Sequence, residues 1–173
     1  MKNRRKNILE SIREQEGSYQ YTGDSYRLCK GPDQKGHPLW RLTVCCILTA
    51  LPVICSGCID ADAANGTFYV ILPFVGEVSC LFLLIWNYIR LVYSKDKMRA
   101  YVLDHIRSRI PGAAAVLSLC SMAGLALSLS YLIRNGSGGR LRESILYMIC
   151  KAAAAVFALG CRRAFRKLTW EKA

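Results

Sequence analysis

The chain has 173 residues, of which 53% are apolar, and it carries a formal net charge of +12. Its mean hydropathy is positive, +0.20, and the apolar residues are gathered into long runs, which excludes an ordinary water-soluble domain. The basic residues lie almost wholly between these runs, where they orient a membrane protein. We therefore expect the lipid bilayer as a partner and no nucleic acid.

Residues 1–38 precede the first apolar run and are mostly polar, so we expect no cleavable signal peptide. Ile8, Leu9 and Ile12 fall on one helical face beside charged residues, which predicts a short amphipathic helix on the membrane surface. A solvated tail is the alternative, because so short a helix is marginal unless it packs against something.

Tyrosines alternate with polar residues on both sides of Gly23 and Asp24. This pattern predicts a small β-hairpin over residues 19–28, with its turn at the two central residues. Glycines and prolines follow in 30–38 and indicate a linker. Residues 1–38 are thus expected to form a cytoplasmic N-terminal segment.

Four apolar runs follow, each close to the length of about 20 residues that a helix needs to cross a bilayer. They occupy residues 39–59, 67–93, 111–133 and 144–161. Pro111 suits the first turn of a helix, where its missing N–H costs nothing. We predict an all-α fold: a polytopic membrane protein whose domain, 39–161, is a four-transmembrane-helix bundle, followed by a basic tail, 162–173.

The Lys and Arg residues are divided unevenly between the two predicted sides of the membrane. Residues 1–41, 90–110 and 162–173 carry 9, 6 and 5 of them. The turns at 60–66 and 134–143 carry 0 and 3. Cytoplasmic segments are enriched in basic residues, so both termini are expected in the cytoplasm of a multi-pass cell-membrane protein, with anionic lipids at that face.

Two opposite charges lie inside the apolar runs, Glu77 in the second and Lys151 in the fourth. At a rise of about 1.5 Å per residue, Glu77 lies roughly 15 Å deep and Lys151 roughly 11 to 12 Å deep, counted from the same side. An unpaired charge near the midplane costs about 2.5 to 3.5 kcal/mol, so pairing is favoured. We therefore predict that the second and fourth spans touch near these residues.

Small residues should line the faces that meet around this pair, because they let helices approach closely. Ala154, Ala155 and Ala158 share the face of Lys151. The third span carries Cys120, Gly124 and Ser128 at four-residue spacing. The face of Glu77 includes Pro73, Cys80, Leu81 and Tyr88.

Three interpretations of Glu77 and Lys151 remain open from the sequence. The pair can be structural and fix the register of the helices. It can be functional, as a proton or ion relay or a substrate site of a small transporter or channel. In the third case Lys151 extends outward to the interface, or Glu77 faces the helix of a partner protein.

Cys55 and Cys58 form a Cys-x-x-Cys at the outer end of the first span. Together with the helix count, this pair resembles the four-span disulfide-bond oxidases and quinone-linked thiol reductases. The resemblance implies thiol–disulfide exchange at the outer surface beside a quinone. In the alternative the two cysteines are small packing residues, because neither outer loop holds another cysteine and a helix C-terminus disfavours a thiolate.

No other residues suggest a reaction. His37 and His105 lie on the predicted side opposite to the cysteine pair, so we expect no metal site and no cofactor. Among the functions considered, we favour a non-catalytic accessory, scaffold or assembly subunit that binds a membrane-protein partner or a second copy of itself. A transporter or a thiol–disulfide oxidoreductase is the alternative.

Overall fold

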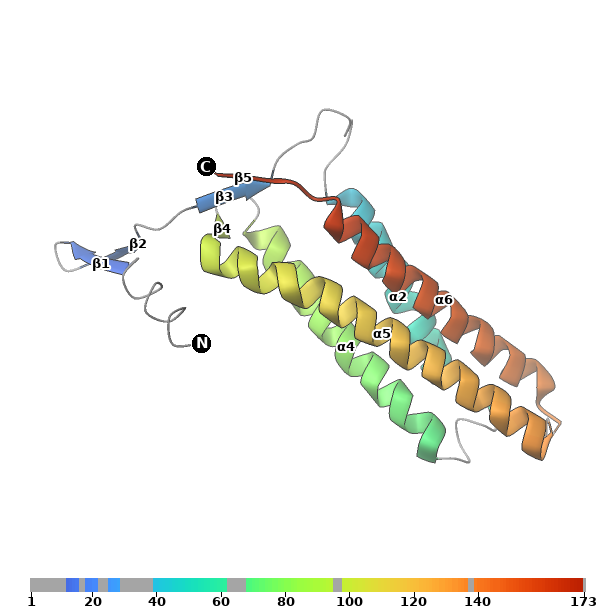
Figure 1. Ribbon diagram of the computed structural model, residues 1–173. Coiled ribbons are helices and arrows are strands. Elements are labelled where there is room, and N and C mark those ends of the chain that lie inside the picture. Colours follow the sequence, from blue (N-terminus) through green and yellow to red (C-terminus); the bar gives the residue numbers. More distant parts are fainter. Residues whose placement is uncertain are drawn as a thin grey trace.

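The computed structural model describes seven stretches of the chain. They are residues 12–15, 18–21, 25–28, 39–61, 68–94, 98–136 and 139–172. Within these residues four long helices lie side by side, and short strands lie at or beyond one end of them (Figure 1).

The helices are α2 (Trp40–Cys58), α4 (Phe68–Tyr93), α5 (Ala100–Asn135) and α6 (Leu141–Arg166). Each is long and apolar enough to cross a membrane. The prediction of a helical chain with four candidate spans is therefore confirmed, and the composition is that of a multi-pass membrane protein.

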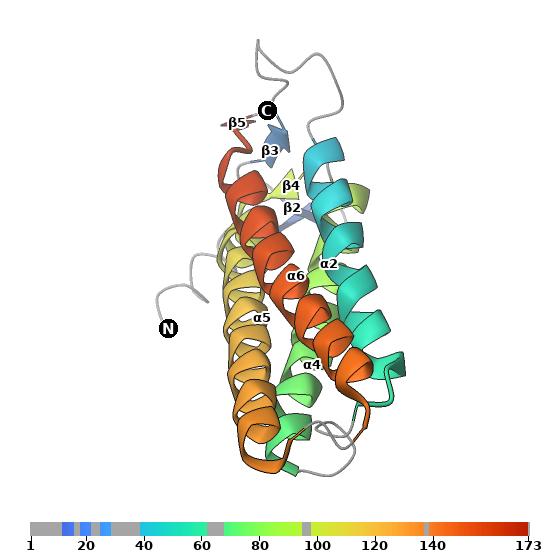
Figure 2. The ribbon, with the colours of Figure 1, turned by 90° about the vertical axis from the view of Figure 1, so that its right-hand side faces the viewer.

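Each helix packs mainly against one or two of the others. α4 packs against α5, α5 against α6, and α6 against α2, while α2 and α4 make lighter contact (Figure 2). One link between α2 and α4 is a hydrogen bond of 2.6 Å between the hydroxyls of Thr43 and Tyr88. In this arrangement α4 and α6 lie across the unit from each other and do not pack as neighbours.

The third helix begins earlier than the sequence predicted. α5 starts at Ala100 and runs through Pro111, so this proline lies inside the helix and not in its first turn. The charged stretch before Pro111 is helical because it carries an apolar stripe that packs into the core. The buried residues of this stripe are Val102, Leu103, Ile106 and Ile110.

The fourth helix also extends beyond its predicted end. α6 continues to Arg166, whereas the predicted end of the last span is residue 161. Cys161 and Phe165 are buried on its inner face and join the same apolar cluster as α5. The final turn is thus held by packing, although its outer face is basic.

The strands of the N-terminal segment pair differently from the predicted hairpin. β1 (Ile12–Gln15) pairs antiparallel with β2 (Ser18–Tyr21). The predicted hairpin across Gly23 and Asp24 is therefore wrong, because β2 and the strand after it belong to different sheets. The prediction that Ile12 lies in a helix is also wrong, because this residue lies in β1. The two residues between β1 and β2 include a glycine in sequence, which favours a short hairpin. Ile8, Leu9 and the linker 30–38 lie outside the described residues.

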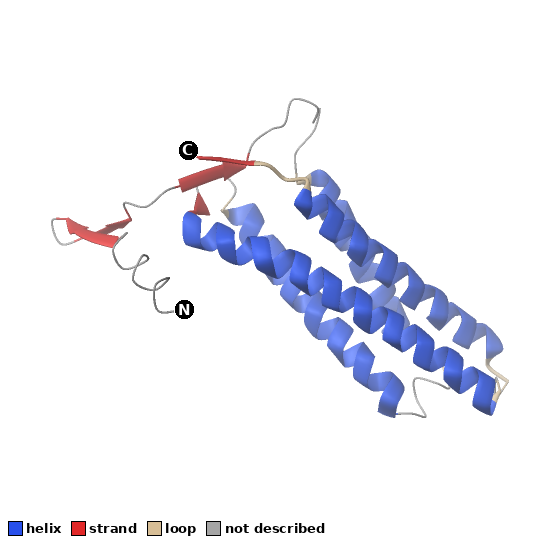
Figure 3. Cartoon of the chain, viewed as in Figure 1, coloured by secondary structure: helices blue, strands red, loops and turns tan. Residues whose placement is uncertain are grey.

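A three-stranded sheet joins three segments that are far apart in the sequence. β3 (Ser25–Leu28) is the central strand, between β4 (Met98–Arg99) and β5 (Trp170–Lys172). The all-α prediction thus holds for the four helices, and this sheet lies at one end of them (Figures 1 and 3). Met98 is fully buried there, with Tyr26 and Trp170 packed against its cluster.

The end of the four helices that carries this sheet is the basic end. α2 and α5 begin there, and α4 and α6 end there. The described Lys and Arg residues near it are Arg27, Arg41, Arg90, Arg99, Arg107, Arg109, Arg162, Arg163, Arg166, Lys167 and Lys172. Near the opposite end they are Arg134, Arg140 and Arg142. The segments predicted to share one side of the membrane therefore lie at one end of the structure.

Candidate functional site

The structure brings Glu77 and Lys151 together in the middle of the four helices. Lys151 Nζ donates a hydrogen bond of 2.6 Å to Glu77 Oε2. Both side chains have an exposed fraction of 0%. Two opposite charges removed from solvent are therefore paired directly, as the cost of burying either one alone requires.

The pair lies at one level because each residue stands at a similar distance from the same end of its helix. Glu77 follows Phe68, the first residue of α4, by nine positions, and Lys151 follows Leu141, the first residue of α6, by ten. At about 1.5 Å per residue both lie roughly 14 to 15 Å from the end opposite to the basic end. The side chains meet across the centre although α4 and α6 are not neighbours.

Two aromatic rings enclose the ammonium group of Lys151. Its Nζ lies 4.6 Å from the ring centroid of Phe74 and 5.0 Å from that of Tyr147. Phe74 stands three residues before Glu77 on α4, and Tyr147 stands four residues before Lys151 on α6, so each ring projects from the same helix face as its charge. Both rings present electron-rich faces to the cation in a dry environment.

Gly124 of α5 provides the space in which the two charges meet. A Cβ added at this position would lie 3.6 Å from Glu77 Oε1 and 3.7 Å from Lys151 Cδ and Cε. A methyl group fits at these distances, whereas a larger side chain would push into the ion pair. The third helix thus forms the floor of the site through the absence of a side chain.

The carboxylate is not fully hydrogen-bonded. Within the described residues, Glu77 Oε1 and Ser121 Oγ are both buried and both lack a hydrogen-bond partner. Ser121 lies one turn before Gly124 on the buried face of α5, within hydrogen-bonding reach of the Glu77 carboxylate. A water molecule or a small shift of the Ser121 side chain would satisfy both atoms.

The small residues named from the sequence lie mostly on the buried faces of α5 and α6. Ala154, Ala155 and Ala158 are buried on α6, and Gly124 and Ser128 are buried on α5. Cys120 is half-buried and faces α4, where a Cβ added to Gly76 would lie 3.1 Å from its sulfur. The helices approach closely at these positions, as small residues permit.

Several contributors to the site were missed in the sequence analysis. Phe74, Tyr147 and Ser121 were not named, nor was Gly76. The first two carry a recognisable signal, since each is an aromatic residue one helical turn before a charge inside an apolar run. Nothing in the sequence distinguishes Ser121 from the other serines of the third span.

The Cys-x-x-Cys lies at the C-terminal end of α2, where Gly57 packs against the ring of Phe74. Cys55 and Cys58 are free and exposed at the C-terminal end of α2. A different thiol contact joins α2 to α6, where the sulfurs of Cys46 and Cys161 lie 3.9 Å apart in the core. His105 lies on α5, His37 lies outside the described residues, and no metal-ligand cluster occurs within the described part of the chain.

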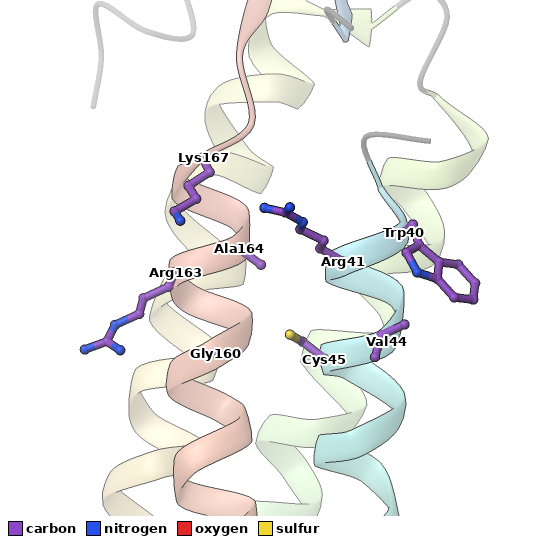
Figure 4. A pocket seen from close by; sticks show the side chains of 8 residues that line it. All are labelled: Trp40, Arg41, Val44, Cys45, Gly160, Arg163, Ala164 and Lys167. Atoms are coloured by element: carbon purple, nitrogen blue, oxygen red, sulfur yellow. The ribbon is translucent and has the colours of Figure 1, made fainter. Parts of the chain in front are cut away.

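A cavity of about 350 Å³ lies between α2 and α6 at the basic end (Figure 4). We call it the α2–α6 cavity. It is lined by Trp40, Arg41, Val44, Cys45, Gly160, Arg163, Ala164 and Lys167. Glu77 and Lys151 do not line it, so the ion pair and this cavity are separate features of the four helices.

Removal of one partner of the ion pair should destabilise the protein far more than removal of both. Glu77→Gln or Lys151→Met alone leaves a charged partner buried and should cost about 3 to 5 kcal/mol. The double variant leaves no charge and should lie within about 1 kcal/mol of the unchanged protein. Unfolding of the purified chain in mixed micelles, titrated with a denaturing detergent, measures these differences.

The exposed ion pair between Arg140 and Asp60 provides the control for this cycle. Asp60→Asn should change stability by no more than about 1 kcal/mol, as exposed pairs do. Additive losses from the two single substitutions at Glu77 and Lys151 would contradict a coupled, buried pair.

Side-chain volume at Gly124 should decide whether the ion pair can form. Gly124→Ala should be tolerated, whereas Gly124→Leu should destabilise the protein by roughly 1 to 3 kcal/mol or more through overpacking. Gly112→Leu is a matched control on the same helix, because a Cβ added there meets nothing within 4 Å. Equal unfolding midpoints for the two leucine variants would show that Gly124 does not form the floor of the site.

Comparison of the chain with protein-family models, with curated proteins and with solved structures found no match. The function has therefore to be inferred from the residues and their geometry.

Proposed function

We propose that this protein is a four-helix-bundle membrane protein with both termini in the cytoplasm, and that it acts as a non-catalytic accessory or assembly subunit. In this role Glu77 and Lys151 are structural: they specify which helix faces meet and at what level. The outer faces of the helices are then free to contact lipid or the helices of a partner.

The observation that carries this proposal is that the ion pair is shielded from solvent on all sides. Both charges have an exposed fraction of 0%, and they are bonded to each other. The rings of Phe74 and Tyr147 and the backbone of Gly124 surround them. A transport or relay site must exchange ions or protons with water at some stage, whereas a register-setting pair is best kept dry.

The basic end supports the proposed orientation. β3, β4 and β5 hold the N-terminal segment, the α4–α5 connection and the C-terminal segment at this end. Most described Lys and Arg residues outside the ion pair lie there too. A cytoplasmic location of this end satisfies the positive-inside rule for all three segments at once.

A small proton- or ion-coupled transporter is the second candidate. One observation favours it: Glu77 Oε1 and Ser121 Oγ are buried polar atoms without a hydrogen-bond partner among the described residues, beside the fully buried charges of Glu77 and Lys151. Such atoms often mark a place where water or an ion binds. Substitution of Glu77 and Lys151 separates the two candidates.

The double variant Glu77→Gln/Lys151→Met distinguishes a structural pair from a transport site. For an accessory subunit, this variant should capture the same membrane-protein partner as the unchanged chain when purified in mild detergent. Proteoliposomes that contain only the unchanged chain should show no proton or cation flux above empty vesicles. Flux that is present in the unchanged chain and lost in the double variant would establish the transporter instead.

A further inference from the structure

The α2–α6 cavity joins an apolar wall to a basic mouth. Val44 and Cys45 of α2 and Gly160 and Ala164 of α6 form the wall. The space exists because Gly160 and Ala164, one turn apart on α6, have little or no side chain. A Cβ added to Gly160 would lie 3.6 Å from the sulfur of Cys45, so the two helices are close at the bottom of the cavity.

Three cations lie around the mouth. Arg41 extends from α2 across the gap toward α6, and Lys167 stands at the C-terminal end of α6 beside it (Figure 4). Arg163 lies one turn earlier on α6 and extends away from α2 (Figure 4). Within the described residues no carboxylate pairs with any of these three side chains. The positive charge at this mouth is thus left available for an anion.

The position of the cavity along the helices matches that of lipid headgroups. Trp40 is the first residue of α2, and its side chain is 66% exposed and extends from α2 away from α6 (Figure 4). Tryptophan is typical of the membrane interface, and the apolar part of α2 begins directly after Arg41. A ligand in this cavity would place its charged part at the interface and its apolar part deeper, along Val44 and Gly160.

The cavity is largely open, so it can hold one part of a ligand while the rest extends along the helices. About 350 Å³ is at the lower end of the range for small-molecule sites, roughly 300 to 1,000 Å³. A whole phospholipid is larger, but a phosphate group with the first part of an acyl chain fits, and the rest of the chain can lie along the helices in the bilayer. A free inorganic anion would leave the apolar wall without a partner.

We propose that the α2–α6 cavity is a binding site for an anionic phospholipid. Arg41 and Lys167 hold its phosphate, with Arg163 adding to the positive field, and one acyl chain lies against Val44, Gly160 and Ala164. Arginine suits this role because its planar guanidinium binds two phosphate oxygens at once. The inference rests on the membrane-spanning orientation proposed above and is independent of the role given to Glu77 and Lys151.

The test uses the fluorescence of Trp40, which lines the cavity. The full chain carrying Trp86→Phe and Trp170→Phe, so that Trp40 is its one tryptophan, is reconstituted into phosphatidylcholine vesicles. These contain a small, equal fraction of either brominated phosphatidylglycerol or brominated phosphatidylcholine. We expect the anionic lipid to quench Trp40 several-fold more strongly. Arg41→Gln/Lys167→Gln should abolish this preference, because each cation near an anionic lipid contributes a factor of about five to its binding.

The matched control is Arg90→Gln/Arg109→Gln, which removes two cations from the same end of the helices but not from this cavity. It should keep the preference for the anionic lipid. Ala164→Leu fills the apolar wall and leaves the cations in place, so it should also reduce the preference. Unchanged circular dichroism and gel-filtration profiles show that each variant is folded.

The outcomes separate the lipid site from its alternatives. Equal quenching by the two lipids, or the same loss in both double variants, would overturn the site while leaving the membrane orientation intact. Displacement of the brominated lipid by inorganic phosphate as effectively as by short-chain phosphatidylglycerol would show a site for free anions and would overturn the lipid assignment. No quenching of Trp40 by either lipid would contradict the membrane-spanning orientation itself.

Discussion

Four apolar helices that enclose a carboxylate and an ammonium group have to bring the two charges together, because either one alone would be buried at a cost of several kcal/mol. In this protein Lys151 Nζ lies 2.6 Å from Glu77 Oε2, and neither side chain is exposed. The contact joins α4 to α6 across the centre, so it constrains two helices that do not otherwise pack together. A rotation or a one-turn slip of either helix would separate the charges.

The other features near the centre follow from this constraint. Gly124 keeps α5 from filling the space, and Phe74 and Tyr147 cover the ammonium group. Phe74 also contacts α2, since a Cβ added to Gly57 would lie 2.9 Å from its ring. All four helices therefore contribute to the packing around the ion pair. α4 and α6 supply the charged and aromatic side chains, and α5 and α2 supply small residues that make room for them. The basic end, with its sheet and the α2–α6 cavity, is a separate region, and neither Glu77 nor Lys151 lines that cavity.

Much of the helical part could be predicted because long apolar runs and inward charges are strong local signals. The depths of Glu77 and Lys151 in their spans predict that the two charges pair. The helical repeat predicts that Ala154, Ala155 and Ala158 share the face of Lys151. The start of α5 at Ala100 was missed because its apolar stripe is interleaved with charges, and Pro111 suggested a helix start. The pairing of β3 with β4 and β5 was missed because it joins distant segments, whereas hairpin signals report only on neighbours in sequence.

The most direct test of the central claim is the distance between the two charged groups in a lipid bilayer. Magic-angle-spinning NMR of the full chain, with ¹⁵N-labelled lysine and ¹³C-labelled glutamate, reports it through dipolar dephasing of the glutamate carboxyl carbon. We predict strong dephasing from one Lys–Glu pair, consistent with the Nζ–Oε2 distance of 2.6 Å, and its loss in Lys151→Met. Dephasing that is absent, or that persists in Lys151→Met, would contradict the account.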